Sequence, residues 1–225
     1  MEIFEQHEQF EMQVLSRLQS ARLLEKLVFG GGTMLRLCHE LNRYSVDLDF
    51  YLKKKGDKPI LADRLKGVFE TEYQIRNFQV KRNTILLEFS SPQFPRKLKL
   101  EINTNNRYTD VEQSIAWSKY SQTQTMVTTI TLPKMMELKI NALLDREEIR
   151  DAFDIEFLIR RGIEIVASRE SIIKVKHVLE ALKPNDFKVK LGSIVSSDVR
   201  TYYNENGFSF LIQHLNYMES KMKSG

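Results

Sequence analysis

Two aspartates, Asp47 and Asp49, stand one residue apart in the segment VDLDFYL. Acidic and apolar residues alternate through this segment, which predicts a β-strand over residues 46–52. Side chains at positions i and i+2 of a strand share a face, so both carboxylates project together while Leu48 and Phe50 face the core. Two carboxylates held this close favour a divalent cation, and Mg²⁺ prefers oxygen ligands. The alternative is an exposed strand face with two hydrated acids.

Three glycines, Gly30 to Gly32, precede this strand. They follow a short apolar run at residues 26–30 and come before a segment at 33–41 with helical spacing. Bare backbone at the start of a helix lets a phosphate approach the N–H groups there. No Gly-Lys-Ser/Thr follows, and the spacing is not Gly-x-Gly-x-x-Gly, so neither the P-loop nor the dinucleotide fingerprint is present. A tight turn that needs positive φ explains the glycines equally well.

A third carboxylate is available on the predicted strand at residues 96–104. Alternation places Lys97, Lys99 and Glu101 on one face and the apolar residues on the other. With the aspartate pair, Glu101 completes the ligand set of a two-metal site that clamps the attacking and leaving oxygens at phosphorus. The alternative is an exposed acid that pairs with a neighbouring lysine.

The second half of the chain carries a separate charged set. Lys139 and Arg146 are seven residues apart on a predicted helix at 133–146 and share one face. They are suited to a triphosphate or an RNA backbone, lysine as a point charge and arginine as a bidentate donor. On the next predicted helix, Asp151 and Asp154 are three apart and face the same way. A salt-bridge cluster between the helices is the alternative.

Composition sets wider limits. The chain has 225 residues, a net charge of +4 and 42% hydrophobic residues, which suits one large or two small globular domains and permits a polyanionic partner. The single cysteine, Cys38, forms no internal disulfide and predicts a reducing compartment. The acidic N-terminus does not have the pattern of a secretory signal. No run reaches the roughly 18 apolar residues of a membrane span, so we expect a cytoplasmic protein that contacts no membrane.

The layout predicts a mixed α/β first half and an all-α second half. The predicted elements of the first half, besides those above, are helices at residues 5–26 and 60–70 and strands at 73–82 and 84–90, the last two joined as a hairpin. Polar composition at 103–129 predicts a linker or irregular cover there. Helices are expected from residue 133 to the C-terminus, one of them capped by Ser168.

Taken together, FGGGTMLRL and LNRYSVDLDF resemble the nucleotidyltransferase superfamily related to DNA polymerase β. Within it they resemble the AbiEii/AbiGii family, also called MenT-like toxins, whose members carry Gly-Gly-Thr-Ala-Leu and then Arg-Phe-Ser-x-Asp-Leu-Asp-Phe. The matching residues are Gly31, Gly32, Thr33, Met34, Leu35, Arg43, Tyr44, Ser45, Asp47, Leu48, Asp49 and Phe50. Relatives often have lysine where this chain has Gly30.

The helical part adds a second match. The family carries a lysine, then Ala-Leu, an arginine and Arg-Asp-x-x-Asp. The corresponding residues are Lys139, Ala142, Leu143, Arg146, Arg150, Asp151 and Asp154. The two motif sets occur in the same order as in the family and fall within residues 29–160. The remaining C-terminal residues match only as generic helices.

The resemblance implies an α+β fold: a nucleotidyltransferase-like mixed sheet flanked by helices over residues 1–125, then a C-terminal helical bundle over 126–225 that completes the active-site cleft. It also implies transfer of a nucleotide from an NTP to an acceptor hydroxyl, with Mg²⁺ or Mn²⁺ as cofactor. In the toxins the acceptor is usually tRNA, and each toxin is typically paired with an antitoxin in a phage-defence system. NTP, tRNA or another RNA, and a cognate antitoxin are therefore the expected partners.

The resemblance also assigns roles. The expected metal ligands are Asp47, Asp49 and Glu101. The expected catalytic residues are these three with Lys139, Asp151 and Asp154. The expected nucleotide-binding residues are Gly31, Gly32, Thr33, Arg43, Ser45, Lys139, Arg146 and Arg150. Two alternatives stay open: the same enzyme acting on a small-molecule hydroxyl, and a degenerate fold that binds nucleotide or RNA without turnover.

Overall fold

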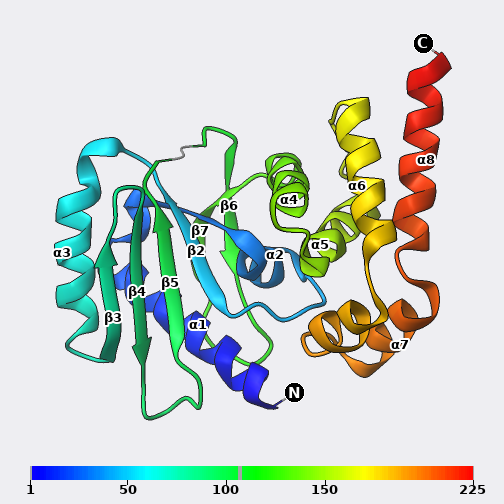
Figure 1. Ribbon diagram of the computed structural model, residues 1–225. Helices are drawn as coiled ribbons and strands as arrows, with labels where there is room; N and C mark the ends of the chain where they lie inside the picture. The colour runs from blue at the N-terminus through cyan, green and yellow to red at the C-terminus, as the bar shows by residue number, and fades with distance from the viewer. Residues whose placement is uncertain (1, 106–107, 225) are drawn as a thin grey trace. The chain divides into compact units, whose positions relative to one another are not determined.

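The computed structural model describes residues 2–105 and 108–224 (Figure 1). The chain divides into two compact units, Met1–Thr131 and Leu132–Gly225. The first combines a mixed sheet with helices, and the second is helical. The predicted α+β fold class is confirmed. No helix among the described residues is long and apolar enough to cross a membrane.

The described residues of the first unit form a seven-stranded sheet in the order β3-β4-β5-β2-β1-β7-β6. The strands are β1 (Leu27–Gly30), β2 (Asp47–Leu52), β3 (Gln74–Val80), β4 (Thr84–Ser90), β5 (Leu98–Asn103), β6 (Val111–Ala116) and β7 (Thr125–Ile130). Two neighbouring pairs are parallel, β2 with β5 and β1 with β7, and the others are antiparallel. The sheet is therefore mixed, and its centre consists of strands from distant parts of the chain.

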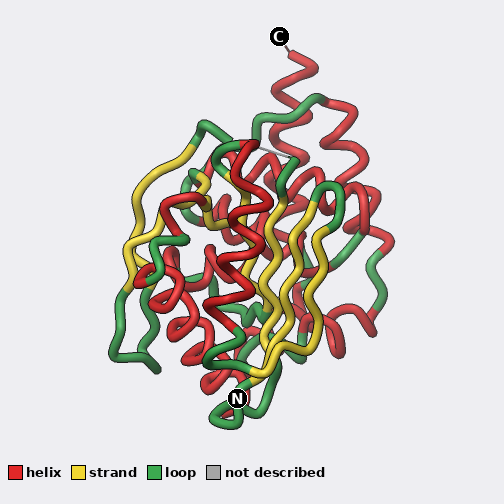
Figure 2. The backbone as a smooth tube through the Cα atoms, turned by 90° about the vertical axis from the view of Figure 1, so that its left-hand side faces the viewer, coloured by secondary structure: helices red, strands yellow, loops and turns green. Residues whose placement is uncertain are grey.

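Helices cover the apolar face of the sheet. The helices of the first unit are α1 (Glu2–Ser20), α2 (Gly31–His39) and α3 (Lys58–Phe69), with short 3-10 turns at Leu24–Lys26 and Lys55–Asp57. Figures 1 and 2 show α1 and α3 against one side of strands β3–β5. There Phe10 of α1 and Phe69 of α3 both contact Phe89 of β4, and all three are fully buried. Burial alternates along β2, β4 and β5, so each strand turns its apolar side toward these helices.

The prediction of a linker or irregular cover at 103–129 is wrong for the residues that the structure describes. This segment contains β6 and β7, and residues 106 and 107 within it lie outside the described part. Both strands are rich in polar residues, and β6, at the edge of the sheet, is mostly exposed. An edge strand needs little apolar surface, while threonine favours extended backbone, so polarity alone misled the prediction.

The helical unit begins where the sheet ends. Its helices are α4 (Leu132–Arg146), α5 (Ile149–Arg160), α6 (Arg169–Ala181), α7 (Ser197–Asn206) and α8 (Ser209–Ser224), with a short π-helix at Asp186–Leu191. The expected cap is confirmed, because the Ser168 hydroxyl accepts the backbone N–H of Ser171. Nearly every residue of α5 is buried, which makes it the central helix of this unit.

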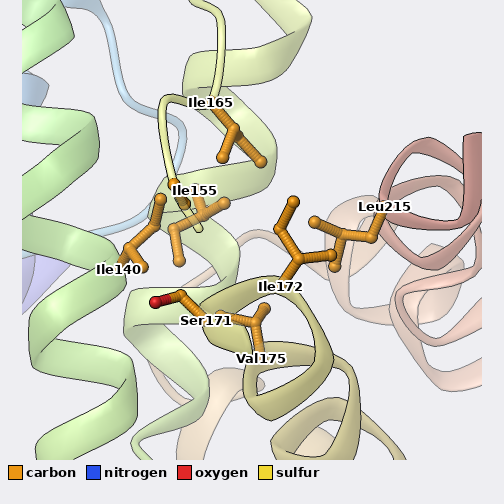
Figure 3. Close-up of a pocket in the computed structure, with 8 residues that line it drawn as sticks. Ile140, Ile155, Ile165, Ser171, Ile172, Val175 and Leu215 are labelled. Atoms are coloured by element: carbon orange, nitrogen blue, oxygen red, sulfur yellow. The ribbon is translucent and has the colours of Figure 1, made fainter. Parts of the chain in front are cut away.

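A small gap lies among α4, α5, α6 and α8 (Figure 3). Its volume is about 10 Å³, and isoleucine, valine and leucine side chains form most of its wall. Ser171 is the polar residue in that lining. A trapped water needs two to four polar partners, which this apolar lining does not offer. The gap therefore reflects imperfect helix packing, and its volume is too small for a substrate.

A group of ionisable side chains is buried where α1 meets α2 and the start of β2. His7 Nε2 donates to the Val46 carbonyl oxygen at 3.0 Å, and Glu8 forms an ion pair with Arg36 of α2. Glu11 is buried too, and its carboxylate oxygens have no hydrogen-bond partner. Burial, reinforced by the charge of Glu8, raises the pKa of Glu11 well above its ordinary value, against the smaller effect of Arg36. Glu11 therefore stays protonated in the folded protein where an exposed glutamate ionises.

This raised pKa has a defined effect on stability. The unfolded chain releases the Glu11 proton near its ordinary pKa of 4.5, while the folded chain keeps it. The contribution of Glu11 to the free energy of unfolding is thus complete below about pH 4.5 and is lost as the pH rises toward the folded-state pKa. We expect Glu11→Gln to increase the free energy of unfolding relative to wild type at pH 8, with the difference closing toward pH 4. Urea denaturation across this range measures it. Glu70→Gln, at an exposed glutamate, serves as control, and a pH-independent difference for Glu11→Gln would contradict the prediction.

Candidate active site

The parallel pairing of β2 with β5 brings the predicted acidic residues together. Asp49 lies directly opposite Glu101, and Asp47 lies opposite Lys99. All four side chains are on the face of the sheet that does not pack against α1 and α3, and all are partly exposed. The shared face inferred from alternation is confirmed, and the register adds that Asp49 and Glu101 are immediate neighbours.

Lys99 occupies the centre of this acidic face. Its Nζ lies 3.0 Å from Asp47 Oδ2 and 3.6 Å from Glu101 Oε2. Partial burial by itself would lower the pKa of Lys99, but the hydrogen bond and charge of Asp47, with the charges of Glu101 and Asp49, outweigh it and raise the pKa. The lysine therefore remains a full positive charge among three carboxylates.

The glycine turn at the start of α2 presses against the same carboxylates. Gly31 has φ +75°, and any side chain there would collide with the carboxylate of Asp49. A side chain at Gly32 would collide with the Arg43 guanidinium and the Ser45 hydroxyl. The turn thus needs glycine both for its left-handed backbone and for close approach to the acidic strand. It places the first N–H groups of α2 beside Asp49.

Thr33 has a partner that the sequence did not predict. Its hydroxyl donates to the backbone carbonyl of Asp47 at 2.6 Å, and the side chain is fully buried. Arg43 is also buried and donates to the Tyr44 carbonyl. Thr33 thus holds the backbone of Asp47, and Arg43 holds the backbone that leads into β2. A side chain at Gly30 would collide with the ring of Tyr51.

The donor chemistry at this face suits a hard divalent cation, since carboxylate oxygens are the ligands that Mg²⁺ and Mn²⁺ favour. Across the described residues, however, no group of three or more His, Cys, Asp or Glu side chains is drawn together around a common metal position. Lys99 lies among these acids, with its ammonium 3.0 Å from Asp47 Oδ2 and 3.6 Å from Glu101 Oε2. The residue types therefore fit a divalent metal.

The charged set of the helical unit forms a compact ion cluster between α4 and α5. Lys139 Nζ lies 3.3 Å from Asp151 Oδ1 and 2.6 Å from Asp154 Oδ2, and both aspartates are fully buried. Arg146 donates through Nε and Nη2 to the two oxygens of Asp151, each at 2.7 Å, and stays 43% exposed. Arg150 is exposed. Within this unit the aspartates orient the cations, and the two arginines are the members that solvent reaches.

The family assignment follows from a sequence comparison. The family described as "Nucleotidyl transferase AbiEii toxin, Type IV TA system" matches residues 13–188, which is most of the chain. The chain belongs to the AbiEii family. It is accordingly a nucleotidyltransferase toxin of the type IV toxin–antitoxin class, with an NTP as substrate and an antitoxin as counterpart. Among curated proteins, none matches this chain.

Solved structures share the fold of this AbiEii chain. JHP933 from Helicobacter pylori is 18% identical with a TM-score of 0.56, each chain covered to 96%. A candidate nucleotidyltransferase from H. pylori is 19% identical with a TM-score of 0.59, covering 95% of this chain and 97% of that one. MenT4, a nucleotidyltransferase toxin from Mycobacterium tuberculosis, is 15% identical with a TM-score of 0.51, covering 91% and 85%. The similarity therefore spans both units.

The sequence predicted for Lys99 only the alternative that a neighbouring lysine pairs with Glu101, which the structure shows; it predicted no role for His7. The signal for Lys99 was present, because alternation already placed it on the face of Glu101. For His7 no local pattern exists, since its contact with Val46 joins residues 39 apart in the chain. His7 and Thr33 both hold the backbone at the start of β2, one on each side of the Val46–Asp47 junction.

The glycine turn gives a testable expectation for this AbiEii enzyme. Gly31→Ala should reduce nucleotide transfer, and growth inhibition on expression, by about 100-fold, because the added methyl displaces the Asp49 carboxylate. Gly162→Ala is the matched control, since Gly162 also has positive φ but open space around it. That variant should lose about 1 kcal/mol of stability and retain transfer. If both variants lose the same amount of activity, the loss in Gly31→Ala comes from backbone strain and not from displacement of Asp49.

The ion cluster gives a stability expectation. Asp151→Ala should lower the free energy of unfolding by about 3 kcal/mol, because it leaves buried Lys139 short of one partner and Arg146 with none of its carboxylate bonds. Urea denaturation followed by circular dichroism measures this. Glu137→Ala, which removes the exposed partner of Lys134, should cost under about 1 kcal/mol. If both variants lose less than about 1 kcal/mol of unfolding free energy, the ion pairs of Asp151 contribute no more to stability than an exposed pair does.

Proposed function

We propose that this AbiEii protein transfers a nucleotide from an NTP to a hydroxyl of tRNA, and that it depends on Mg²⁺ or Mn²⁺. The observation that carries the proposal is the register of β2 and β5. It sets Asp49 beside Glu101, while the turn at Gly31 brings the start of a helix against the Asp49 carboxylate. Acidic oxygens and helix N–H groups at one place suit a metal-bound triphosphate.

Asp47, Asp49 and Glu101 are the residues proposed to hold the metal. When bound, a divalent ion supplies Lewis-acid polarisation of a phosphoryl oxygen and charge neutralisation. The protein residues have their own tasks beside it. Thr33 and His7 hold the backbone carbonyls at the start of β2, so the two aspartates keep their direction. Glu101, about 39% exposed, is proposed to lower the proton affinity of the attacking hydroxyl.

The glycine turn is proposed to bind phosphate oxygens through the backbone N–H groups of Gly31 and Gly32. Ser45 and Arg43 lie against Gly32, so they are proposed to shape this turn for the nucleotide. The role expected for the Thr33 hydroxyl changes here: because it is buried on Asp47, we propose that it positions the acid and does not touch phosphate.

For the helical unit, we propose contact with a polyanion, triphosphate or RNA, through Arg146 and Arg150, which solvent reaches. Arg146 engages Asp151 through one edge of its guanidinium, and a planar guanidinium can bind a phosphate through another edge. Lys139 is 6% exposed and bound by two buried aspartates. We therefore propose that Lys139, Asp151 and Asp154 support these arginines.

Transfer from labelled NTPs tests the function. Wild-type protein with Mg²⁺ and total tRNA should label the tRNA, and chelation of the metal should abolish labelling. Asp49→Ala should reduce both labelling and growth inhibition to background. Asp49 is paired with Gly30 of β1 and with Glu101 of β5, and its carboxylate lies against the turn at Gly31. Asp63→Ala, at an exposed aspartate of α3, is the control and should behave as wild type.

The outcomes separate the alternatives. If the label enters small hydroxyl compounds and not tRNA, the acceptor is a small molecule, and the proposal of nucleotide transfer still holds. Undiminished toxicity in a soluble, folded Asp49→Ala variant would contradict the catalytic reading altogether.

A further inference from the structure

Lys99 lies in a row of charged side chains that crosses three strands. In the register of the sheet, Glu88 of β4 is opposite Lys99, and Lys99 is opposite Asp47 of β2. The Lys99 ammonium bonds to Asp47 at 3.0 Å and reaches Glu101, two residues along its own strand, at 3.6 Å. It therefore bridges two of the three carboxylates that the proposed reaction assigns to metal.

The neighbouring charges are compensated separately. Glu88 pairs with Lys97 at 2.7 Å, so it does not draw on Lys99. The Lys99 ammonium lies between Asp47 and Glu101, where a second divalent ion shared by these two carboxylates would have to bind. Two cations at that position would repel each other.

The sheet fixes the backbone of Lys99. β5 is hydrogen-bonded on both sides, to β4 and to β2, so the Lys99 backbone cannot shift away from the acids. Its side chain is 33% exposed, similar to Asp47 at 34%. Partial burial weakens screening by water, so the lysine and a second divalent ion between Asp47 and Glu101 would repel strongly.

We propose that Lys99 is a built-in cation that takes the place of a second metal ion, so that this enzyme binds a single divalent ion on the face formed by Asp47, Asp49 and Glu101. This inference rests on the proposed function, because it concerns the same acidic face. It makes Lys99 a charge-bearing residue of the site beside Glu101. Neutral substitution of Lys99 then opens a second cation position.

Binding of Mn²⁺ alone tests the inference without any turnover. Electron paramagnetic resonance of free Mn²⁺ in equilibrium with the full-length protein gives the stoichiometry. Wild type should bind one Mn²⁺ per chain at this face, and Lys99→Met should bind two, with dipolar broadening from a close pair of ions. Lys99→Arg, which keeps the charge, should bind one.

Lys97→Met is the matched control. Lys97 directly precedes β5 and also pairs with an acid, but its partner is Glu88. The variant removes the same charge a short distance away and should still bind one Mn²⁺. As a second readout, Lys99→Met should have a lower melting temperature than wild type in chelator and a larger rise on adding Mn²⁺, because its carboxylates repel until cations bind.

The results separate the inference from the function it rests on. If wild type binds two Mn²⁺ per chain, the role of Lys99 is overturned and the metal site remains. The same holds if folded Lys99→Met and folded Lys99→Gln each bind only one Mn²⁺ per chain. Mn²⁺ binding that is absent from wild type and from Lys99→Met alike would overturn the proposed metal site itself. Binding that survives Asp49→Ala unchanged in affinity would place the ion elsewhere and also overturn the proposed site.

Discussion

The parallel pairing of β2 with β5 is the constraint on which the candidate active site depends. It places Asp49 beside Glu101 and Asp47 beside Lys99, and so concentrates negative charge on one face of the sheet. Such concentration is unfavourable unless cations balance it. Lys99 provides part of that balance from within the sheet. On the apolar face of the same sheet, Phe89 of β4 packs on α1 and α3, so core burial supports the charged face.

Buried side chains and a glycine turn hold the backbone around the acids in place. Thr33 and His7 bind successive carbonyls at the start of β2, and the Gly31 turn fits the Asp49 carboxylate only because it has no side chain. In the helical unit, buried Asp151 and Asp154 orient Lys139 and Arg146 in the same manner. Each unit therefore uses buried polar contacts to present charged groups, which is the usual requirement for preorganised binding of phosphate.

Family membership and local structure agree closely. The AbiEii match covers residues 13–188, and the motif residues that led to the resemblance lie on the turn, strand and helices that sequence patterning predicted. Patterning failed at residues 103–129, where polar strands β6 and β7 resembled a linker. It also ended the first helix late: α1 stops at Ser20, and Arg22 adopts a left-handed backbone that breaks it.

The sequence by itself determined the alternation that sets Asp47, Asp49 and Glu101 apart from the apolar core, the order of the two motif sets, and the change from sheet to helices. These are local properties, because strand and helix periods depend on neighbouring residues. Only the tertiary structure decided which strand lies beside which, and hence that Lys99 stands among the acids and that Thr33 serves Asp47. Such pairings join residues far apart in the chain, and their energy comes from register and burial, which no local period encodes.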